Sequence, residues 1–215
     1  MILDRLVALS ALSLLAACAP AGGAGTDSGN ALTAELTILG EGDLLSGARE
    51  VTSIQGAWIA ASELEFRPCQ EGGEDVETDY AGNFVIDLAA GETLGTTELD
   101  FDTVCRLEFE LERADAPGEP MDGLSLRVDG TTAGGLPFSV QSERRWEFEI
   151  LEELPLQEAM NRLDLLFDAN RWFDDIDPDL GEVTEGTVLI DGAHNAELLD
   201  VFEDALEASA RLGRN

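Results

Sequence analysis

Apolar and polar side chains alternate along much of this chain, and this period of two restricts the possible folds more than any other feature. The alternation is unbroken in residues 32–38 and recurs in residues 105–112, where Cys105 and three apolar residues share one face. Successive side chains of a β-strand point to opposite faces, so the pattern is typical of strands with one buried face. It predicts further strands at residues 57–66, 84–88, 97–101, 124–128, 137–140, 146–150 and 187–190.

Glycine-rich segments separate these predicted strands, and residues 129–135 have the composition of a hairpin connection. Residues 154–167 fit the spacing of a helix as well as that of a strand, and we predict a strand over residues 162–168. Many short strands joined by turns predict an all-β fold. We therefore expect an antiparallel β-sandwich over residues 31–191.

The C-terminal segment, residues 192–215, has a different periodicity, with apolar residues at helical spacing and acidic residues between them. Asn195 is a suitable N-cap and Gly213 a suitable end for a helix. Glu207 precedes Arg211 by four residues, which is the favourable order for an ion pair along a helix. We predict an amphipathic helix packed on the sandwich. A helix that binds a partner would show the same apolar stripe.

The only long apolar run of the chain ends in Leu15-Ala16-Ala17-Cys18. It is shorter than the roughly 20 residues that a membrane-spanning helix needs, so it is a processing segment. With this ending, residues 1–18 resemble the signal of bacterial lipoproteins. The resemblance implies that Leu15, Ala16 and Ala17 are recognised, that Cys18 receives a diacylglyceryl group, and that residues 1–17 are removed. The alternative is an ordinary secretory signal with a coincidental cysteine.

Residues 18–30 follow with small residues and glycines, the composition of a flexible tether. Ala19 stands directly after Cys18. In lipoproteins an aspartate at that position favours the inner membrane, so the resemblance implies the outer membrane, with the domain facing the periplasm or the cell surface. Two or three acyl chains hold a protein firmly on a bilayer. A soluble domain tethered to the membrane is therefore expected.

The chain has 12 basic and 45 acidic residues, a formal net charge of -33. Nucleic-acid binding is excluded as a function because it requires a basic surface. All the basic residues are arginines, so lysine nucleophiles and Schiff bases are excluded as well. The acidic surface either keeps the domain soluble and apart from other copies or binds cations such as calcium.

Cys69 and Cys105 remain once Cys18 carries a lipid. Disulfides persist in the cell envelope, and we predict a bond between these two residues. Two buried free thiols are the alternative. Cys105 shares the apolar face of its predicted strand, so the bond would join the core to a loop.

Three aspartates at alternate positions, Asp175, Asp177 and Asp179, form the best candidate for a cation site. Carboxylates at this spacing in a turning loop can converge on one calcium ion. The loop departs from the helical calcium loop, because Leu180 stands where the sharp turn needs glycine. The alternative is a solvated acidic turn. The neighbouring Trp172 and Phe173 either anchor the core or present an exposed contact for sugar rings or another protein.

Catalysis has little support in the sequence. His194 is the only histidine, and neither a GxSxG nor an HExxH motif occurs. We therefore predict a non-catalytic binding or structural domain of the cell envelope, whose partner is a polysaccharide or an envelope protein. The body loosely resembles uncharacterised immunoglobulin-like or transthyretin-like sandwich domains of secreted bacterial proteins, a likeness that transfers no site. The alternative is a glycoside hydrolase that works through a pair of carboxylates.

Overall fold

The computed structural model describes residues 32–41, 52–69, 74–157 and 160–214. Strands make up most of these residues, which confirms the all-β class, and every predicted strand overlaps an observed one. The strands are β1 (Leu32–Glu41), β2 (Thr52–Pro68), β3 (Val76–Asp87), β4 (Glu92–Leu99), β5 (Thr103–Leu111), β6 (Leu126–Thr132), β7 (Pro137–Ser142), β8 (Trp146–Pro155), β9 (Met160–Asp168), β10 (Val183–Thr184), β11 (Thr187–Ile190) and β12 (Ala210–Arg214). The helical elements are η1 (Ala169–Arg171), η2 (Pro178–Leu180) and α1 (Ala196–Ser209).

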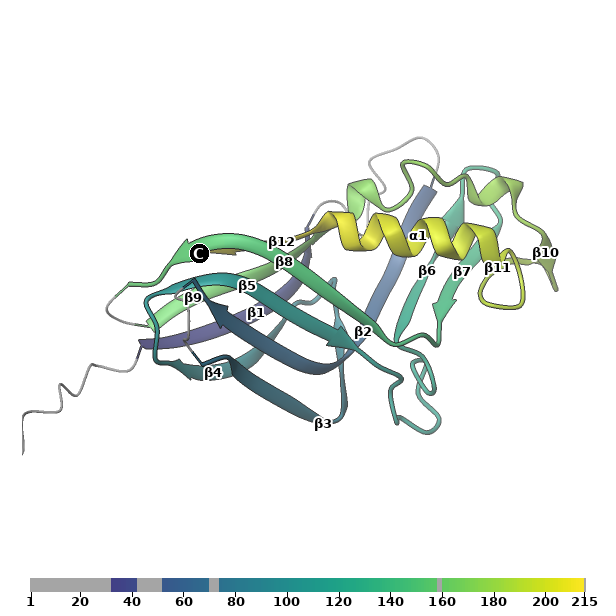
Figure 1. Ribbon diagram of the computed structural model, residues 1–215. Helices are drawn as coiled ribbons and strands as arrows, with labels where there is room; N and C mark the ends of the chain where they lie inside the picture. Colours follow the sequence, from purple (N-terminus) through teal and green to yellow (C-terminus); the bar gives the residue numbers. More distant parts are fainter. Residues whose placement is uncertain (1–31, 42–51, 70–73, 158–159, 215) are drawn as a thin grey trace, which may run out of the picture.

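The strands form two sheets (Figure 1). One has four strands in the order β12-β9-β1-β4, and the other has eight, in the order β10-β11-β7-β6-β2-β5-β8 with β3 also paired to β2. Most ladders are antiparallel, as predicted. The β1–β9 and β7–β11 ladders are parallel, an arrangement that requires a long connection rather than a hairpin between the two strands.

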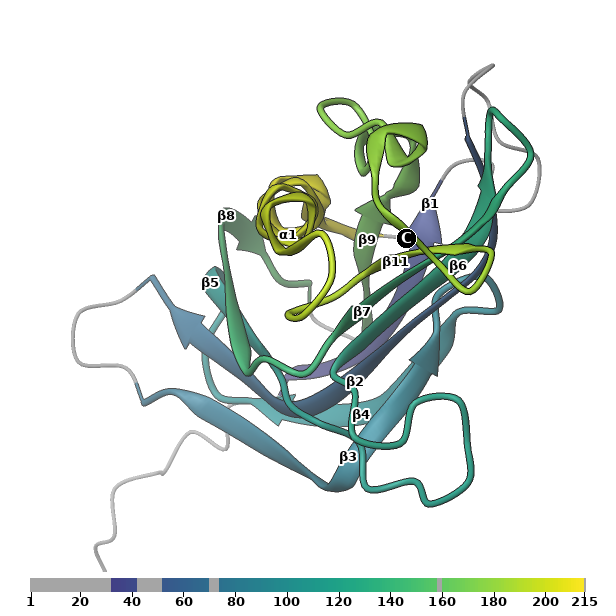
Figure 2. The same cartoon turned by 90° about the vertical axis from the view of Figure 1, so that its right-hand side faces the viewer.

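The long strand β2 organises the larger sheet because it is shared by several partners. Residues 52–59 pair with β6, and residues 61–68 pair with β5, while β3 pairs with residues 58–66. The molecule therefore has two halves, which lie side by side in Figure 1 and one behind the other in Figure 2. In the sandwich half, β3, β5, β8 and the end of β2 face the four-stranded sheet. In the helix-covered half, α1 lies over β6, β7 and β11.

One hydrophobic core runs through both halves. In the sandwich half, Phe148 of β8 makes an edge-on ring contact with Phe167 of the opposite sheet, their ring centres 5.8 Å apart. In the helix-covered half, Phe202 of α1 packs against Phe173, which in turn packs against Phe138 of β7. Apart from Phe173, which lies in the loop between η1 and η2, these rings are the apolar members of the alternating and helical patterns, so burial of one face per element builds most of the core.

The C-terminal helix is shorter than residues 192–215, and the prediction of its end was wrong. The helix ends at Ser209, and Gly213 and Arg211 belong to β12, which pairs with β9. The backbone of these residues completes a ladder on the edge of β9, which outweighs two more turns of helix. Arg211 forms an ion pair with Glu41 of β1, so the pair predicted with Glu207 is absent.

Asn195 precedes the helix at the predicted cap position, but its side chain does not cap it. The side chain instead binds main-chain groups of Glu182 and Leu189. Asn195 has a φ of 53°, a left-handed conformation that asparagine adopts more readily than most residues. It therefore fixes the loop that leads from β11 into α1.

Candidate functional site

The predicted lipid-attachment residue Cys18 and the recognition residues Leu15, Ala16 and Ala17 lie outside the described residues. The structure therefore leaves the lipid anchor a prediction. The first described strand, β1, begins at Leu32, at the end of the sandwich half away from β10 (Figure 1). Among the described residues, no helix is long and apolar enough to cross a membrane.

The predicted disulfide between Cys69 and Cys105 is confirmed. Cys69 follows β2 and Cys105 lies in β5, with their Cα atoms 4.8 Å apart. The prediction that Cys105 faces the core was wrong, because the β5–β8 ladder shifts register between Val104 and Arg106. The shift places Val104 in the core and leaves Cys105 partly exposed. The bond therefore ties the neighbouring strands β2 and β5 at the surface of the sandwich half.

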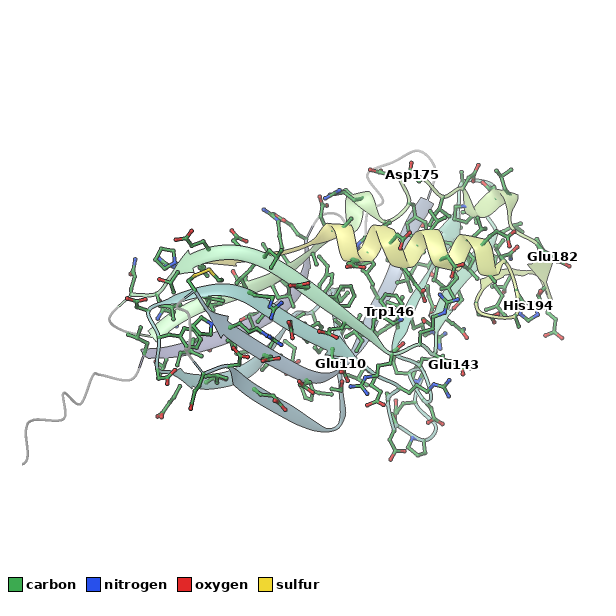
Figure 3. All side chains as sticks on the ribbon, viewed as in Figure 1. Glu110, Glu143, Trp146, Asp175, Glu182 and His194 are labelled. Atoms are coloured by element: carbon green, nitrogen blue, oxygen red, sulfur yellow. A yellow bond between two sulfur atoms is a disulfide. The ribbon has the colours of Figure 1, made fainter. Side chains whose placement is uncertain are left out.

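The three candidate calcium ligands differ in their surroundings. Asp177 caps η2 by accepting a hydrogen bond from the backbone of Asp179. The Asp179 carboxylate accepts one bond of 2.5 Å from the Thr132 hydroxyl and one of 2.9 Å from the Gly134 backbone. It thus ties η2 to the turn between β6 and β7. Asp175, labelled in Figure 3, is exposed.

The described residues contain no group of three or more histidine, cysteine, aspartate or glutamate side chains that could hold a metal ion. The structure therefore does not bring Asp175, Asp177 and Asp179 together as a calcium site. Asp177 is the N-cap of η2 and Asp179 lies within it, and both carboxylates accept hydrogen bonds there, so they do not project together as they would from a calcium loop. Asp179 instead holds the β6–β7 turn in place.

The aromatic pair before these aspartates belongs to the core. Trp172 is fully buried, and its indole N–H donates a 2.9 Å hydrogen bond to the Ser209 hydroxyl at the end of α1. Phe173 packs against Phe138 and Phe202. The interpretation of Trp172 and Phe173 as core anchors is confirmed, and they join η1 to α1.

His194 lies in the loop before α1, and its ring nitrogen Nδ1 is 3.1 Å from the Asp191 carboxylate. The same carboxylate accepts backbone N–H bonds from Ala193 and His194. Partial burial would raise the pKa of Asp191, but these bonds and the nearby ring outweigh it, so the pKa is lowered. The ionised Asp191 therefore holds the loop in shape. This is a structural use of the only histidine.

Two adjoining hollows lie beside this loop, where the connection between β7 and β8 meets α1. We call them together the arginine cleft. The larger has a volume of about 560 Å³ and is lined by Glu112, Arg113, Glu143, Arg144 and Arg145. The smaller, of about 300 Å³, shares Glu143 and Arg144 and is completed by Leu124, Gln141, Asp191, Gly192, Ala193 and Leu199. Figure 3 shows Glu143 between Glu110 and His194 in this view.

Arg144, in the lining of the cleft, binds side chains of α1. Its Nη1 atom donates a 2.6 Å bond to Asp200 and a 2.5 Å bond to Glu203. Glu203 also accepts a 2.8 Å bond from the Ser142 hydroxyl. Burial raises the pKa of Glu203, while Ser142 and Arg144 oppose the shift. Because these carboxylates hold the guanidinium group, Arg144 is fixed in orientation before any ligand arrives.

Arg113 and Arg145 stand at the rim. Arg113 binds Glu143 twice, through Nε to its backbone oxygen at 2.7 Å and through Nη2 to its carboxylate at 3.0 Å. Arg145 forms an ion pair with Glu110 of β5. Nearby carboxylates raise the pKa of Arg144 and Arg145, so both stay charged over the whole physiological range. The cleft therefore gathers three guanidinium groups, each paired with at least one carboxylate.

A second charged cluster lies on the outer face of the sandwich half. Glu65 of β2 stands opposite Glu108 of β5, and Arg67 binds both, at 3.2 Å and 2.8 Å. Burial of its carboxyl group raises the pKa of Glu65 to about 7, and hydrogen bonds with Glu108 and Asp75 add to the shift, while Arg67 opposes it. Glu65 is therefore a group that titrates near neutral pH.

Sequence reasoning missed both the arginine cleft and this glutamate pair. Arg144 and Arg145 are the only two adjacent arginines of the chain, which was a signal in so acidic a sequence. Arg113 is distant in sequence, and only the return of β8 along β5 brings it close. The alternation placed Glu65 and Glu108 on polar faces, but the register that sets them opposite one another depends on strand pairing.

No known protein family matches this chain, and no curated protein matches it. Among solved structures, the chain is similar to the NMR structure of a protein from Eubacterium rectale, at 10% sequence identity. The match covers 68% of this chain and 87% of that one, with a TM-score of 0.23. So low a score carries no argument about fold or function.

Proposed function

We propose that this protein is a lipid-anchored lipoprotein of the cell envelope, whose β-sandwich domain is a non-catalytic binding or structural module. The distribution of its three cysteines carries the proposal. Cys69 and Cys105 are bonded to each other, a state typical of exported proteins. The third, Cys18, is the last residue of Leu15-Ala16-Ala17-Cys18. In the lipoprotein signal that this sequence resembles, the cysteine at that position receives the lipid.

The position of β1 supports the proposal. Residues 19–31 separate Cys18 from the first strand, and 13 residues can reach about 45 Å when fully extended. β1 begins at one end of the sandwich half, whereas the arginine cleft lies beside α1 (Figures 1 and 3). A tether attached there leaves the cleft accessible. The net charge of -33 also keeps the domain itself away from anionic head groups.

The alternative function, a glycoside hydrolase, needs two carboxyl groups about 5 Å or more apart, one of them with a raised pKa. Glu65 has such a pKa, but it is hydrogen-bonded directly to Glu108. That pair is too close to hold a glycosidic bond between its members. The hydrolase hypothesis therefore gains no support from Glu65.

Fractionation of cells that produce the full chain tests the proposal. We expect the wild type in the outer membrane fraction, labelled by palmitate and released only by detergent. The Cys18→Ala variant should lose the label and become soluble. Cys69→Ser with Cys105→Ser is the matched control and should keep both label and location. A soluble, unlabelled wild type would refute the anchor.

A further inference from the structure

We propose that the arginine cleft binds a small monoanion that carries an apolar group, such as an aromatic or short aliphatic carboxylate. This inference deepens the binding role given above and names a ligand class for it. The cleft combines the two features that such a ligand needs. One is the set of arginines at the larger hollow, and the other is an apolar surface in the smaller one.

The arginines select an anionic group. Arg113, Arg144 and Arg145 line the larger hollow together with Glu112 and Glu143, so these five residues have a formal charge of +1 although the chain is at -33. Each arginine is also paired with a carboxylate, so a ligand must bind through the guanidinium N–H donors that these pairs leave over. A guanidinium group has five N–H donors in a planar fork. Asp200 and Glu203 bind Nη1 of Arg144, and Glu110 binds Nη2 of Arg145. The remaining donors of these two arginines suit a carboxylate.

The smaller hollow selects the apolar group. Leu199 of α1, which is buried, and Leu124, which is partly buried, both line this hollow. A volume of about 300 Å³ is the size of a small ligand pocket. Glu143 and Arg144 belong to both hollows, so one molecule can place its carboxylate among the arginines and its apolar part beside the leucines.

The charge of the whole protein limits the ligand to a small anion. A polyanion would bring many negative charges toward a domain of net charge -33 and gain only three arginine contacts. A monoanion meets far less repulsion, and burial of its apolar part adds about 25 cal/mol per Å². Apolar burial and one anchored carboxylate together outweigh that repulsion.

Fluorine NMR on the full chain carrying Cys18→Ala tests the proposal without lipid or detergent. The probe is 4-(trifluoromethyl)benzoate, and the matched neutral probe is 4-(trifluoromethyl)benzamide. We expect saturable broadening of the benzoate signal and binding of the amide at least about tenfold weaker, because a charge-assisted bond is lost. Equal binding of both probes, or binding of neither, would overturn the proposal.

Variants locate the site. Arg145→Gln and Arg113→Gln should each weaken benzoate binding about five- to tenfold, because each removes one cation from the cleft. Arg162→Gln is the matched control, since Arg162 is exposed in the other sheet and pairs with Glu35. An unchanged thermal melt will show that each variant is folded. Equal losses in all three variants would refute the cleft as the site. Because Cys18→Ala carries every measurement, the result is independent of the lipid anchor.

Discussion

The two halves of the molecule are held together by different means. In the sandwich half, strand ladders and the Cys69–Cys105 bond join the elements through the backbone. In the helix-covered half, α1 has no backbone ladder to β7 or β11 and is held by side chains such as Trp172 and Arg144. A strand in a ladder is held by many backbone hydrogen bonds, so it does not open alone. A helix held by side-chain contacts can unfold locally as a unit. The helix-covered half should therefore open first.

Trp172→Ala should have the largest effect, about 3–5 kcal/mol of stability, because a fully buried indole leaves a cavity. The loss should fall on the helix-covered half. Hydrogen exchange measured by mass spectrometry should show faster exchange in α1 and η1, with β5 and β8 still protected. Phe148→Ala is the matched control and should weaken the sandwich half. Equal loss of protection in both halves of Trp172→Ala would contradict the comparison.

Removal of the disulfide by Cys69→Ser with Cys105→Ser should cost up to about 4 kcal/mol, since the bond spans 36 positions and restricts the unfolded chain. Urea unfolding followed by tryptophan fluorescence measures the loss. Reduction of the wild type should give the same midpoint as the double variant. Exchange should quicken in β3 and β4, which lie within the closed loop. If the double variant unfolds at the wild-type midpoint, the bond does not stabilise this half.

Glu65→Gln should have the smallest effect, and its sign should depend on pH. The pKa of Glu65 is raised from 4.5 to about 7 in the folded protein, so the folded state binds the proton more tightly than the unfolded chain. This contribution to stability is fully present below pH 4.5 and is lost as the pH rises to about 7. Arg67, Asp75 and Glu108 lie beside the Glu65 carboxyl group, and together with burial they set the size of its pKa shift.

Urea midpoints of wild type and Glu65→Gln between pH 5 and pH 8 will measure this dependence. The wild type should lose stability relative to the variant as the pH rises through this range. Glu77→Gln is the matched control, because Glu77 pairs with Glu65 across the β2–β3 ladder but is exposed. A constant difference between wild type and Glu65→Gln at every pH would contradict the assignment.

The strands could be predicted because side-chain alternation is a local property of the backbone. Residues 146–150 alternate, and they form the first half of β8. The order of the strands could not be predicted, since alternation does not say which strand pairs with which. β9, for example, pairs with β1 although more than a hundred residues separate them. Cys105 shows the same limit, because one register shift turned its side chain out of the core.

The candidate sites were harder to predict than the fold. The disulfide followed from counting cysteines, but the aspartates at 175, 177 and 179 did not converge, because Asp179 binds Thr132 and Gly134. The arginine cleft draws its residues from segments around positions 113, 144 and 191, which meet only in the folded chain. A spacing rule finds sites within one loop. It does not find sites assembled from several elements.

The sharing of β2 among three partners has a consequence for how the chain is made. Ribosomes release the N-terminus first, and β3, β5 and β6 all follow β2 in the sequence. One edge of this 17-residue strand therefore waits without a partner until β3 has emerged at residue 87, and the other is completed only when β6 has emerged at residue 132. Unpaired edges of this kind attract the edges of other chains. The many glutamates of the polar faces repel neighbouring nascent chains during that wait, so the acidity protects the protein before it is folded.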